Sequence, residues 1–343
     1  MKFLFQTSFL VASLGLASLQ NALWAQTSAL CADGECAPVI SKTTYFARPA
    51  YKLTDGKTEA LIVPQIGRIM RFGKVGGSNL LWNAPTPQGI DWKWKNYGGD
   101  KNWLAPQSNW KALHGHNWPP DPDLDGKPHQ AEVISGGKLK MTSGLSATGI
   151  RMVRIMSFDT NGEFVIEQTA LKQRGPTVRA AIWNISQVVP GEAFFLPLNS
   201  NSSYENGVFA LEKWSETQKI EKVNPKIVRI VPSIAGGNGK IGVDSPVSSL
   251  VSVRDGVAFL QKAPKPAGQY PDGANGAGFP VELYIFGGAK TYYAEMELLG
   301  PLRDFAPGSK STHTMRWSLH DLPSKDVSSS DVVEAVEKLL FSS

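Results

Sequence analysis

The chain has 343 residues, of which 42% are hydrophobic and 19% charged, and its formal net charge is +5. This apolar content is ordinary for a globular protein and excludes a largely disordered chain. Lysine and arginine form no concentrated run, so the sequence lacks the footprint of a nucleic-acid-binding protein. The length suffices for one large or two ordinary domains.

Residues 1–25 have the pattern of a secretory signal peptide. Lys2 provides the positive charge, Phe9–Leu19 is an apolar run of suitable length, and Ala25 is a plausible cleavage point. A membrane-spanning helix needs about 18 or more apolar residues, and the polar residues around this run leave it shorter. The sequence therefore predicts an exported protein, periplasmic or secreted, with no membrane span after signal cleavage.

Residues 26–44 form a lead-in with few structural signals. Cys31 and Cys36 flank the turn-prone spacer Ala-Asp-Gly-Glu, and export would place both outside the reducing cytosol. A disulfide between them would staple the N-terminus locally and add little global stability. Two thiolates alone are a poor zinc site, so no metal is expected here.

From Thr43 onward, short segments rich in β-branched and apolar residues alternate with Gly, Asn and Pro, which is typical of strands and turns. Strand pairs flank turn signals at Asp159–Gly162, Arg254–Gly256 and Gly287–Lys290, so each is predicted to be a hairpin. No propeller-like repeat occurs. One all-β domain of two large sheets is therefore predicted over residues 45–322.

The tail, residues 323–343, is the one part with clear helical periodicity. Asp331 can cap a helix over Val332–Phe341, in which Val332, Val336 and Leu339 share a face. This pattern predicts a short helix that packs on the domain.

The segment Trp92–Glu132 holds five of the ten tryptophans and three of the five histidines. It has no period of 2 or 3.6, so it is not one regular element. Aromatic rings beside turns and charged groups suit a surface that binds a polar ligand with apolar faces, such as a sugar. The alternative is that the aromatics cap a core edge beneath a long loop. We favour the ligand site.

The stretch Thr291–Pro301 is predicted to be a strand whose alternation places Tyr293, Glu295 and Glu297 on one face. Two carboxylates about 7 Å apart beside a phenol suit hydroxyl binding or acid–base work. Alternatively, both glutamates pair with basic cross-strand neighbours on a solvated face. This strand alone favours the second interpretation.

The run from Asp121 to Glu132 has the spacing of an EF-hand calcium loop, with Gly126 sixth. Its context differs, because Trp118-Pro-Pro cannot end a helix into the loop and Pro128 removes an amide. No cofactor is therefore required, and calcium is a secondary prediction. Its ligands would be Asp121, Asp123, Asp125 and Glu132. The pair His114-Gly-His116 lacks the helical spacing of a zinc site.

Several segments resemble the galactose-mutarotase-like superfamily, which includes aldose and hexose-phosphate epimerases. Gly67–Phe72 with Asn79–Trp82 resembles its opening strands, and Tyr97–Gln107 resembles the Gly-Gly…Pro-Gln segment of the hexose-phosphate epimerase branch. Tyr293–Glu297, followed by Pro307–Lys310 and Met315–Leu319, resembles the closing strands that carry the catalytic glutamate. The motifs GGDK-x-W-x-x-PQ and WPPD are most similar to an exported branch without an assigned activity. The resemblance spans Tyr45–Leu322.

This resemblance implies a β-supersandwich of two large, mainly antiparallel sheets that binds carbohydrate on a concave sheet. In mutarotases a glutamate takes the anomeric hydroxyl proton and a histidine protonates the ring oxygen. Glu295 or Glu297 could take the first role. Val178–Val188, where the histidine should lie, contains none, so His114 or His116 would have to substitute. This departure argues against simple mutarotation.

We predict an exported carbohydrate-binding protein without an assigned catalytic activity. One alternative is a sugar-active enzyme, an epimerase or lyase, that uses Glu295 or Glu297 with a loop histidine. Another is a non-catalytic structural protein of the cell envelope. The sequence indicates neither the sugar nor the oligomeric state. The predicted substrate-binding residues are Asp100, Lys101, Trp103, Gln107, Trp110, Arg151 and Trp183.

Overall fold

The computed structural model describes residues 31–32, 35–36, 38–84, 94–234, 237–273, 278–288 and 291–342. The chain divides into two units, Met1–Ala37 and Pro38–Ser343. In the first, β1 (Cys31–Ala32) and β2 (Glu35–Cys36) pair antiparallel with Cys31 opposite Cys36. The predicted signal peptide and the side chains of the two cysteines lie outside the described residues.

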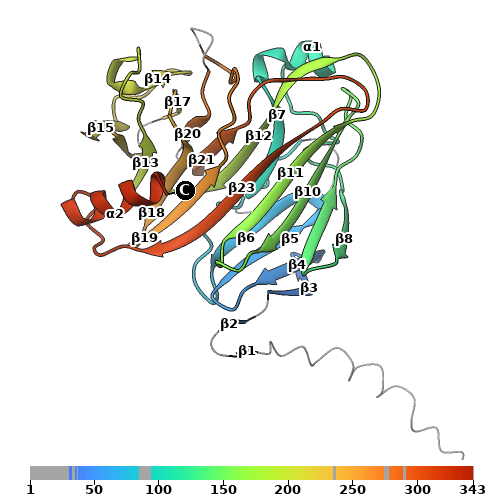
Figure 1. The fold of residues 1–343 in the computed structure, drawn as a ribbon, viewed down its shortest axis with the longest axis horizontal. Coiled ribbons are helices and arrows are strands. Elements are labelled where there is room, and N and C mark those ends of the chain that lie inside the picture. Colours follow the sequence, from blue (N-terminus) through green and yellow to red (C-terminus); the bar gives the residue numbers. More distant parts are fainter. Residues whose placement is uncertain are drawn as a thin grey trace, which may run out of the picture. The chain divides into compact units, whose positions relative to one another are not determined.

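The second unit contains two large antiparallel sheets (Figure 1). The ten-stranded sheet has the order β15 (Lys219–Asn224), β16 (Ile227–Val231), β13 (Ala193–Pro197), β18 (Ser248–Arg254), β19 (Val257–Ala263), β23 (Lys310–Asp321), β11 (Phe164–Lys172), β10 (Ile150–Phe158), β9 (Lys138–Thr142), β8 (Gln130–Ile134). The eleven-stranded sheet has the order β14 (Phe209–Ala210), β17 (Gly239–Val243), β20 (Val281–Gly288), β21 (Thr291–Leu299), β12 (Val178–Val188), β7 (Asp100–Ala105), β6 (Arg68–Lys74), β5 (Thr58–Val63), β4 (Arg48–Thr54), β3 (Val39–Tyr45), and β22 (Arg303–Phe305) pairs with β12.

The main core lies between the sheets, because alternate residues of each strand face inward. On β21 the inward residues are Ala294, Met296 and Leu298, all fully buried. They meet large side chains of the ten-stranded sheet, such as Phe164 and Trp317. The predicted all-β class with two large antiparallel sheets is confirmed.

The three predicted hairpins are also confirmed. β10 pairs with β11, β18 with β19, and β20 with β21. The β18–β19 turn places Asp255 and Gly256 at φ 54° and 78°, the conformation that a tight two-residue hairpin requires and that Asp-Gly tolerates. The sheet begins at Val39, ahead of the predicted start at Tyr45.

Short helices complete the unit. The tail forms α2 (Ser330–Leu340), whose Val332, Val336 and Leu340 pack on the outer face of the ten-stranded sheet. Its N-cap is Ser329, and the predicted cap Asp331 instead lies in the first turn, where a carboxylate favours the helix dipole. The other helical turns are η1 (Pro64–Ile66), η2 (Gln107–Asn109), α1 (Trp110–His114) and η3 (Glu205–Gly207). None of the helices among the described residues is long and apolar enough to cross a bilayer.

Candidate functional site

Charged side chains gather on the outer face of the eleven-stranded sheet, where β17, β20, β21, β12 and β7 lie side by side (Figure 1). Glu295 of β21 lies opposite Tyr284 of β20, and Glu297 lies opposite Glu282. Directly opposed residues of an antiparallel pair share a face. The pairing of β17 with β20 and of β7 with β12 therefore places Lys240 of β17 and Lys101 of β7 on this face as well. We call these five charged residues the charged cluster: Lys101, Lys240, Glu282, Glu295 and Glu297.

Lys240 binds two of the three glutamates. Its Nζ lies 2.6 Å from Glu282 Oε2 and 3.0 Å from Glu297 Oε2, and it stands 4.4 Å from the centre of the Trp183 ring. Trp183 also donates its Nε1–H to Glu297 at 2.7 Å. One largely buried cation thus pairs with two buried carboxylates beside one indole.

Burial raises the pKa of Glu282 well above its usual range, although Lys240 opposes the shift. The pKa of Glu297 is raised for the same reason, and the neighbouring charge of Glu295 adds to it. Burial disfavours the Lys240 cation, but the two carboxylates together raise its pKa above the ordinary value. The geometry therefore keeps Lys240 charged and lets the glutamate pair hold a proton more readily than free glutamates do.

Glu295 is the carboxylate of the cluster that reaches solvent, with 9% of its surface exposed. It accepts hydrogen bonds from Lys101 Nζ at 3.2 Å and Gln187 Nε2 at 2.8 Å. Lys101 in turn stands 4.9 Å from the centre of the Trp103 ring, and burial lowers its pKa although Glu295 opposes the shift. These contacts fix the orientation of the Glu295 carboxylate.

Another ion pair joins β6 of the same sheet to the long loop that follows α1. Arg68 donates to Asp125 Oδ1 at 2.5 Å, and the indoles of Trp103 and Trp94 donate to Oδ2 at 2.8 and 3.0 Å. Burial alone would raise the pKa of Asp125, but the cations of Arg68 and Lys101 lower it. Asp125, predicted as a calcium ligand, therefore anchors the loop to the sheet.

The other predicted calcium ligands have separate partners. Asp121 accepts from the amides of Asp123 and Ala147, at 2.9 and 2.7 Å. Asp123 pairs with Lys127, and Glu132 pairs with Lys140 across β8 and β9. Within the described ranges, no three His, Cys, Asp or Glu side chains are grouped as a metal site would require. Calcium binding at this loop stays a prediction.

The tryptophans of the aromatic segment include buried rings, as a capped core edge requires, and an exposed ring, as a ligand surface requires. Trp103, Trp110 and Trp183, predicted to bind substrate, are 5%, 2% and 2% exposed and belong to a core cluster on this face. Trp103 lies 5.2 Å from Trp110 and 5.3 Å from Trp183, both edge-on. Trp118 is 48% exposed. Trp103, Trp110 and Trp183 thus cap a core edge, and Trp118 reaches solvent.

The two histidines predicted as proton donors, His114 at the end of α1 and His116, lie beside Trp110. The rings of His114 and His116 are 4.4 Å apart, and His114 lies 5.4 Å from Trp110. Burial lowers the pKa of His114, and His116 adds to the effect. Among the described residues neither histidine forms a hydrogen bond or ion pair with Glu295 or Glu297, and a histidine as proton donor to these glutamates stays a prediction.

Three predicted substrate-binding residues lie elsewhere. Asp100 faces the inter-sheet core, because it precedes Lys101 on the same strand and so points to the opposite face. There it accepts from Arg154 and, at 2.7 Å, from Ser186. Arg151 alternates with buried Ile150 and Met152 and so lies on the outer face of the ten-stranded sheet. Gln107 is exposed at the start of η2.

Sequence reasoning missed Lys240, Glu282 and Arg68. The alternation Val281-Glu-Leu-Tyr-Ile contains a signal for Glu282, since it sets a charged residue and Tyr284 on one face. Lys240 gives no such signal, because its role depends on β17 pairing with β20.

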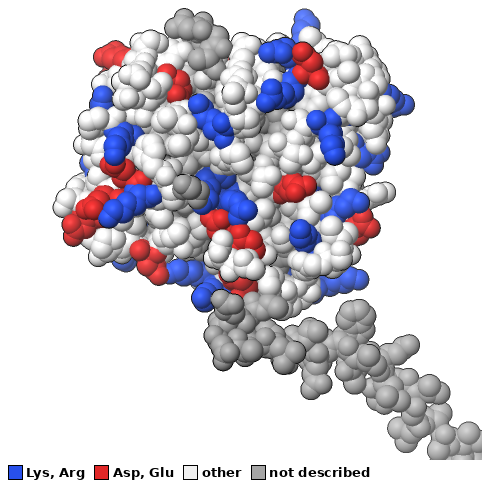
Figure 2. Space-filling view, viewed as in Figure 1, with Lys and Arg blue, Asp and Glu red and all other residues white. Residues whose placement is uncertain are grey.

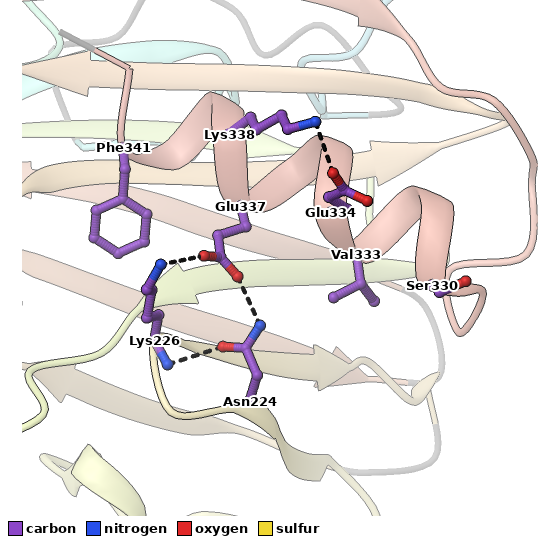
Figure 3. Close-up of a pocket in the computed structure, with 8 residues that line it drawn as sticks. All are labelled: Asn224, Lys226, Ser330, Val333, Glu334, Glu337, Lys338 and Phe341. Atoms are coloured by element: carbon purple, nitrogen blue, oxygen red, sulfur yellow. Dashed lines mark hydrogen bonds and ion pairs between the residues drawn. The ribbon is translucent and has the colours of Figure 1, made fainter.

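A groove of about 760 Å³ lies beside α2 (Figure 3). Its lining residues come from α2 and from the turn between β15 and β16 of the ten-stranded sheet, so it does not belong to the charged cluster. Its charged groups are satisfied by one another. Glu337 accepts from Lys226 Nζ and from Asn224 Nδ2, both at 2.7 Å, and Lys338 pairs with Glu334 at 2.8 Å. On the face drawn in Figure 2, acidic and basic side chains are interspersed. Neither the groove nor this face offers a concentrated charge to a ligand.

Neither a protein-family model nor a curated protein matches the sequence. Solved structures do match. A mutarotase candidate (YeaD) from Salmonella typhimurium superposes with a TM-score of 0.51 at 11% identity, covering 82% of this chain and 94% of that one. A galactose mutarotase-like protein from Lactobacillus casei has a TM-score of 0.49 at 9% identity, covering 82% of this chain and 100% of that one. With two large antiparallel sheets and the superposition on the Salmonella typhimurium structure, the chain has the galactose-mutarotase-like fold.

Proposed function

We propose that the protein binds a carbohydrate at the charged cluster, with no catalytic activity assigned. The observation that carries this proposal is the Glu295 carboxylate, which reaches solvent while Lys101 and Gln187 hold it in place. Half-buried Tyr284 and Phe286 stand on the same face. Oriented charged acceptors bind hydroxyls, and aromatic rings pack on the apolar faces of sugars. The similarity of fold to a mutarotase candidate adds support.

The charge of the cluster favours a neutral sugar. Both ammonium groups of the cluster are already paired with glutamates, so neither is free to pair with an anion. A phosphate or carboxylate on the ligand would also face the Glu295 carboxylate, which reaches solvent. We therefore expect neutral sugars to bind more tightly than uronic acids or sugar phosphates.

A thermal-shift screen against these three sugar classes tests the proposal. A bound sugar at 100 times its dissociation constant should stabilise the protein by about 2.7 kcal/mol. The variant Glu295→Gln should lose that response, because an uncharged amide is a weaker acceptor for hydroxyls. Glu167→Gln is the matched control, since Glu167 is exposed on the other sheet and should leave the response intact. A flat screen would favour the structural-protein alternative.

A second candidate function is acid–base catalysis on a sugar. Burial raises the pKa of Glu297 while Glu295 lies on the same strand and face, so one carboxyl could donate a proton where the other accepts one. This pair would take the place of the expected glutamate and histidine.

If the protein interconverts anomers, Glu297→Gln should slow the reaction by about 10²–10⁴-fold. Activity that needs protonated Glu297 should persist below its raised pKa and fall as the pH rises through it. Polarimetry on a freshly dissolved anomer measures both effects. An unchanged rate in Glu297→Gln would exclude Glu297 as the acid, and no turnover would leave binding as the function.

We also propose that the protein is exported after cleavage at Ala25. Support comes from the charged, apolar and small-residue order of residues 1–25. Mass spectrometry of the exported protein should find an N-terminus at Gln26, and a mass two hydrogen atoms lower than that of the reduced chain if Cys31 and Cys36 are joined. An intact Met1 in the exported protein would refute the cleavage.

A further inference from the structure

The hairpin between β3 and β4 has non-glycine residues at positive φ in two consecutive positions. Phe46 and Ala47 form its two-residue connection, and their φ values are 44° and 64°. Such a turn suits Asn-Gly or Gly-Gly, since a side chain at positive φ costs roughly 1–2 kcal/mol per residue. Backbone strain of this kind is typical of functional sites.

The turn presents an aromatic ring to solvent. Phe46 is 60% exposed, and its ring lies edge-on to Tyr45 at 4.7 Å. Tyr45 is itself held in place, because its Oη accepts from Asn83 Nδ2 at 3.1 Å while the same amide donates to the Met70 carbonyl at 3.0 Å. The exposed ring is therefore supported by a fixed neighbour.

These rings stand on the same face of the sheet as the charged cluster. Tyr45 packs against Ala50, Met70 and Tyr97, which lie on the side of the sheet opposite the main core. Tyr97 also faces the guanidinium of Arg68 at 5.7 Å. The hairpin tip and the cluster thus share one surface.

Further aromatic rings lead from the hairpin towards Glu295. Trp82 precedes Asn83 and lies 4.7 Å from Tyr293, and Tyr293 stacks on Phe286 at 5.2 Å. Tyr293 stands two residues before Glu295 on the same face. From β21 to β3 the sheet crosses six strand spacings, up to about 29 Å. A single sugar ring cannot span that distance, whereas a chain of sugars can.

We propose that Phe46, supported by Tyr45, is a distal platform on which a neutral oligosaccharide stacks while its end occupies the charged cluster. This inference rests on the proposed function and narrows the ligand class from a single sugar to a chain. The strained turn is explained if the position of the Phe46 ring is kept for binding rather than for stability.

Two variants at adjacent positions separate the ring from the strain. Phe46→Asn removes the ring and places a residue that tolerates positive φ, and Ala47→Gly relieves strain while keeping the ring. Both should raise the melting temperature. Only Phe46→Asn should weaken oligosaccharide binding, by about three- to tenfold, the loss expected for one aromatic contact.

The measurement is calorimetric titration of both variants and the unaltered protein with panels of neutral glycans graded from one to six units. We expect affinity to rise with length, and Phe46→Asn to remove the gain without changing the affinity for the single sugar. Binding of single sugars with no gain for any longer glycan would overturn the platform and leave the proposed function standing. If no glycan of any length binds, the proposed function fails as well. A change of oligomeric state in Phe46→Asn without a change in glycan affinity would show the ring to be a protein contact and would also overturn the platform.

Discussion

Replacing Lys240 with methionine is expected to lower the free energy of unfolding by about 3–5 kcal/mol at pH 7. The reason is that Lys240 binds Glu282 and Glu297 at once, and these two glutamates are 0% and 1% exposed. Without the cation, two buried carboxylates would face each other across β20 and β21. Urea denaturation of the variant and the unaltered protein measures the difference.

The loss of stability in Lys240→Met should be smaller at low pH. Burial raises the pKa of Glu282 and Glu297 in the folded protein, so the folded state binds protons more readily than the unfolded chain. Stability from these groups is present below the unfolded pKa and is lost as the pH rises through the folded one. Removing the cation raises both pKa values further. The variant should therefore lose less stability at pH 5 than at pH 7.

Two control variants separate charge from packing. Lys240→Met combined with Glu282→Gln and Glu297→Gln removes the buried charges and should recover much of the loss. Lys74→Met breaks the pair with Asp321, but both side chains are largely exposed, so it should cost only about 0–1 kcal/mol. A loss in Lys240→Met that is equal at both pH values, or that the triple variant does not recover, would mean that packing and not charge explains it.

The sequence predicted the local part of this fold well, because strand alternation and turn chemistry act over a few residues. The period of two placed Tyr293, Glu295 and Glu297 on one face, and the structure sends Ala294 and Met296 to the core. Each of the three hairpins could be predicted from a local turn signal, an Asn-Gly, an Asp-Gly or a Gly-Gly pair.

The partners of each glutamate could not be predicted in the same way. Lys240 reaches Glu297 only because β17 joins the sheet beside β20, a pairing between strands far apart in the chain. The ion pair of Asp125 with Arg68 could not be predicted for a similar reason. The calcium-loop spacing around Asp125 is a local pattern, and calcium binding stays a prediction, whereas Arg68 comes from β6.

Strand alternation separates two neighbouring residues that the sequence prediction assigns to one site. Asp100 and Lys101 are neighbours in the GGDK motif, and both were assigned to the ligand. Consecutive strand residues face opposite sides, so only Lys101 faces the charged cluster and Asp100 faces the other sheet.

The placement of Asp100 leads to the second large expected effect. Arg154→Met should lower the free energy of unfolding by about 3–5 kcal/mol. Asp100 is fully buried, and without Arg154 it would keep, from the described part of the chain, only the side-chain hydrogen bonds from Asn184 and Ser186. In the double variant with Asp100→Asn no buried charge is left unpaired, so the two losses should not add. A double-mutant cycle measured by urea denaturation should give a coupling of at least about 1 kcal/mol.

The same variants decide whether Asp100 serves the fold or the ligand. Asp100→Asn should destabilise the protein and leave its response to a bound sugar intact, since the side chain lies between the sheets and not on the outer face. The matched variant Glu295→Gln should abolish the sugar response. If Asp100→Asn instead abolished the sugar response at unchanged stability, the inter-sheet ion pair would have to open during binding. In that case the GGDK motif would act on the ligand through both of its charged residues.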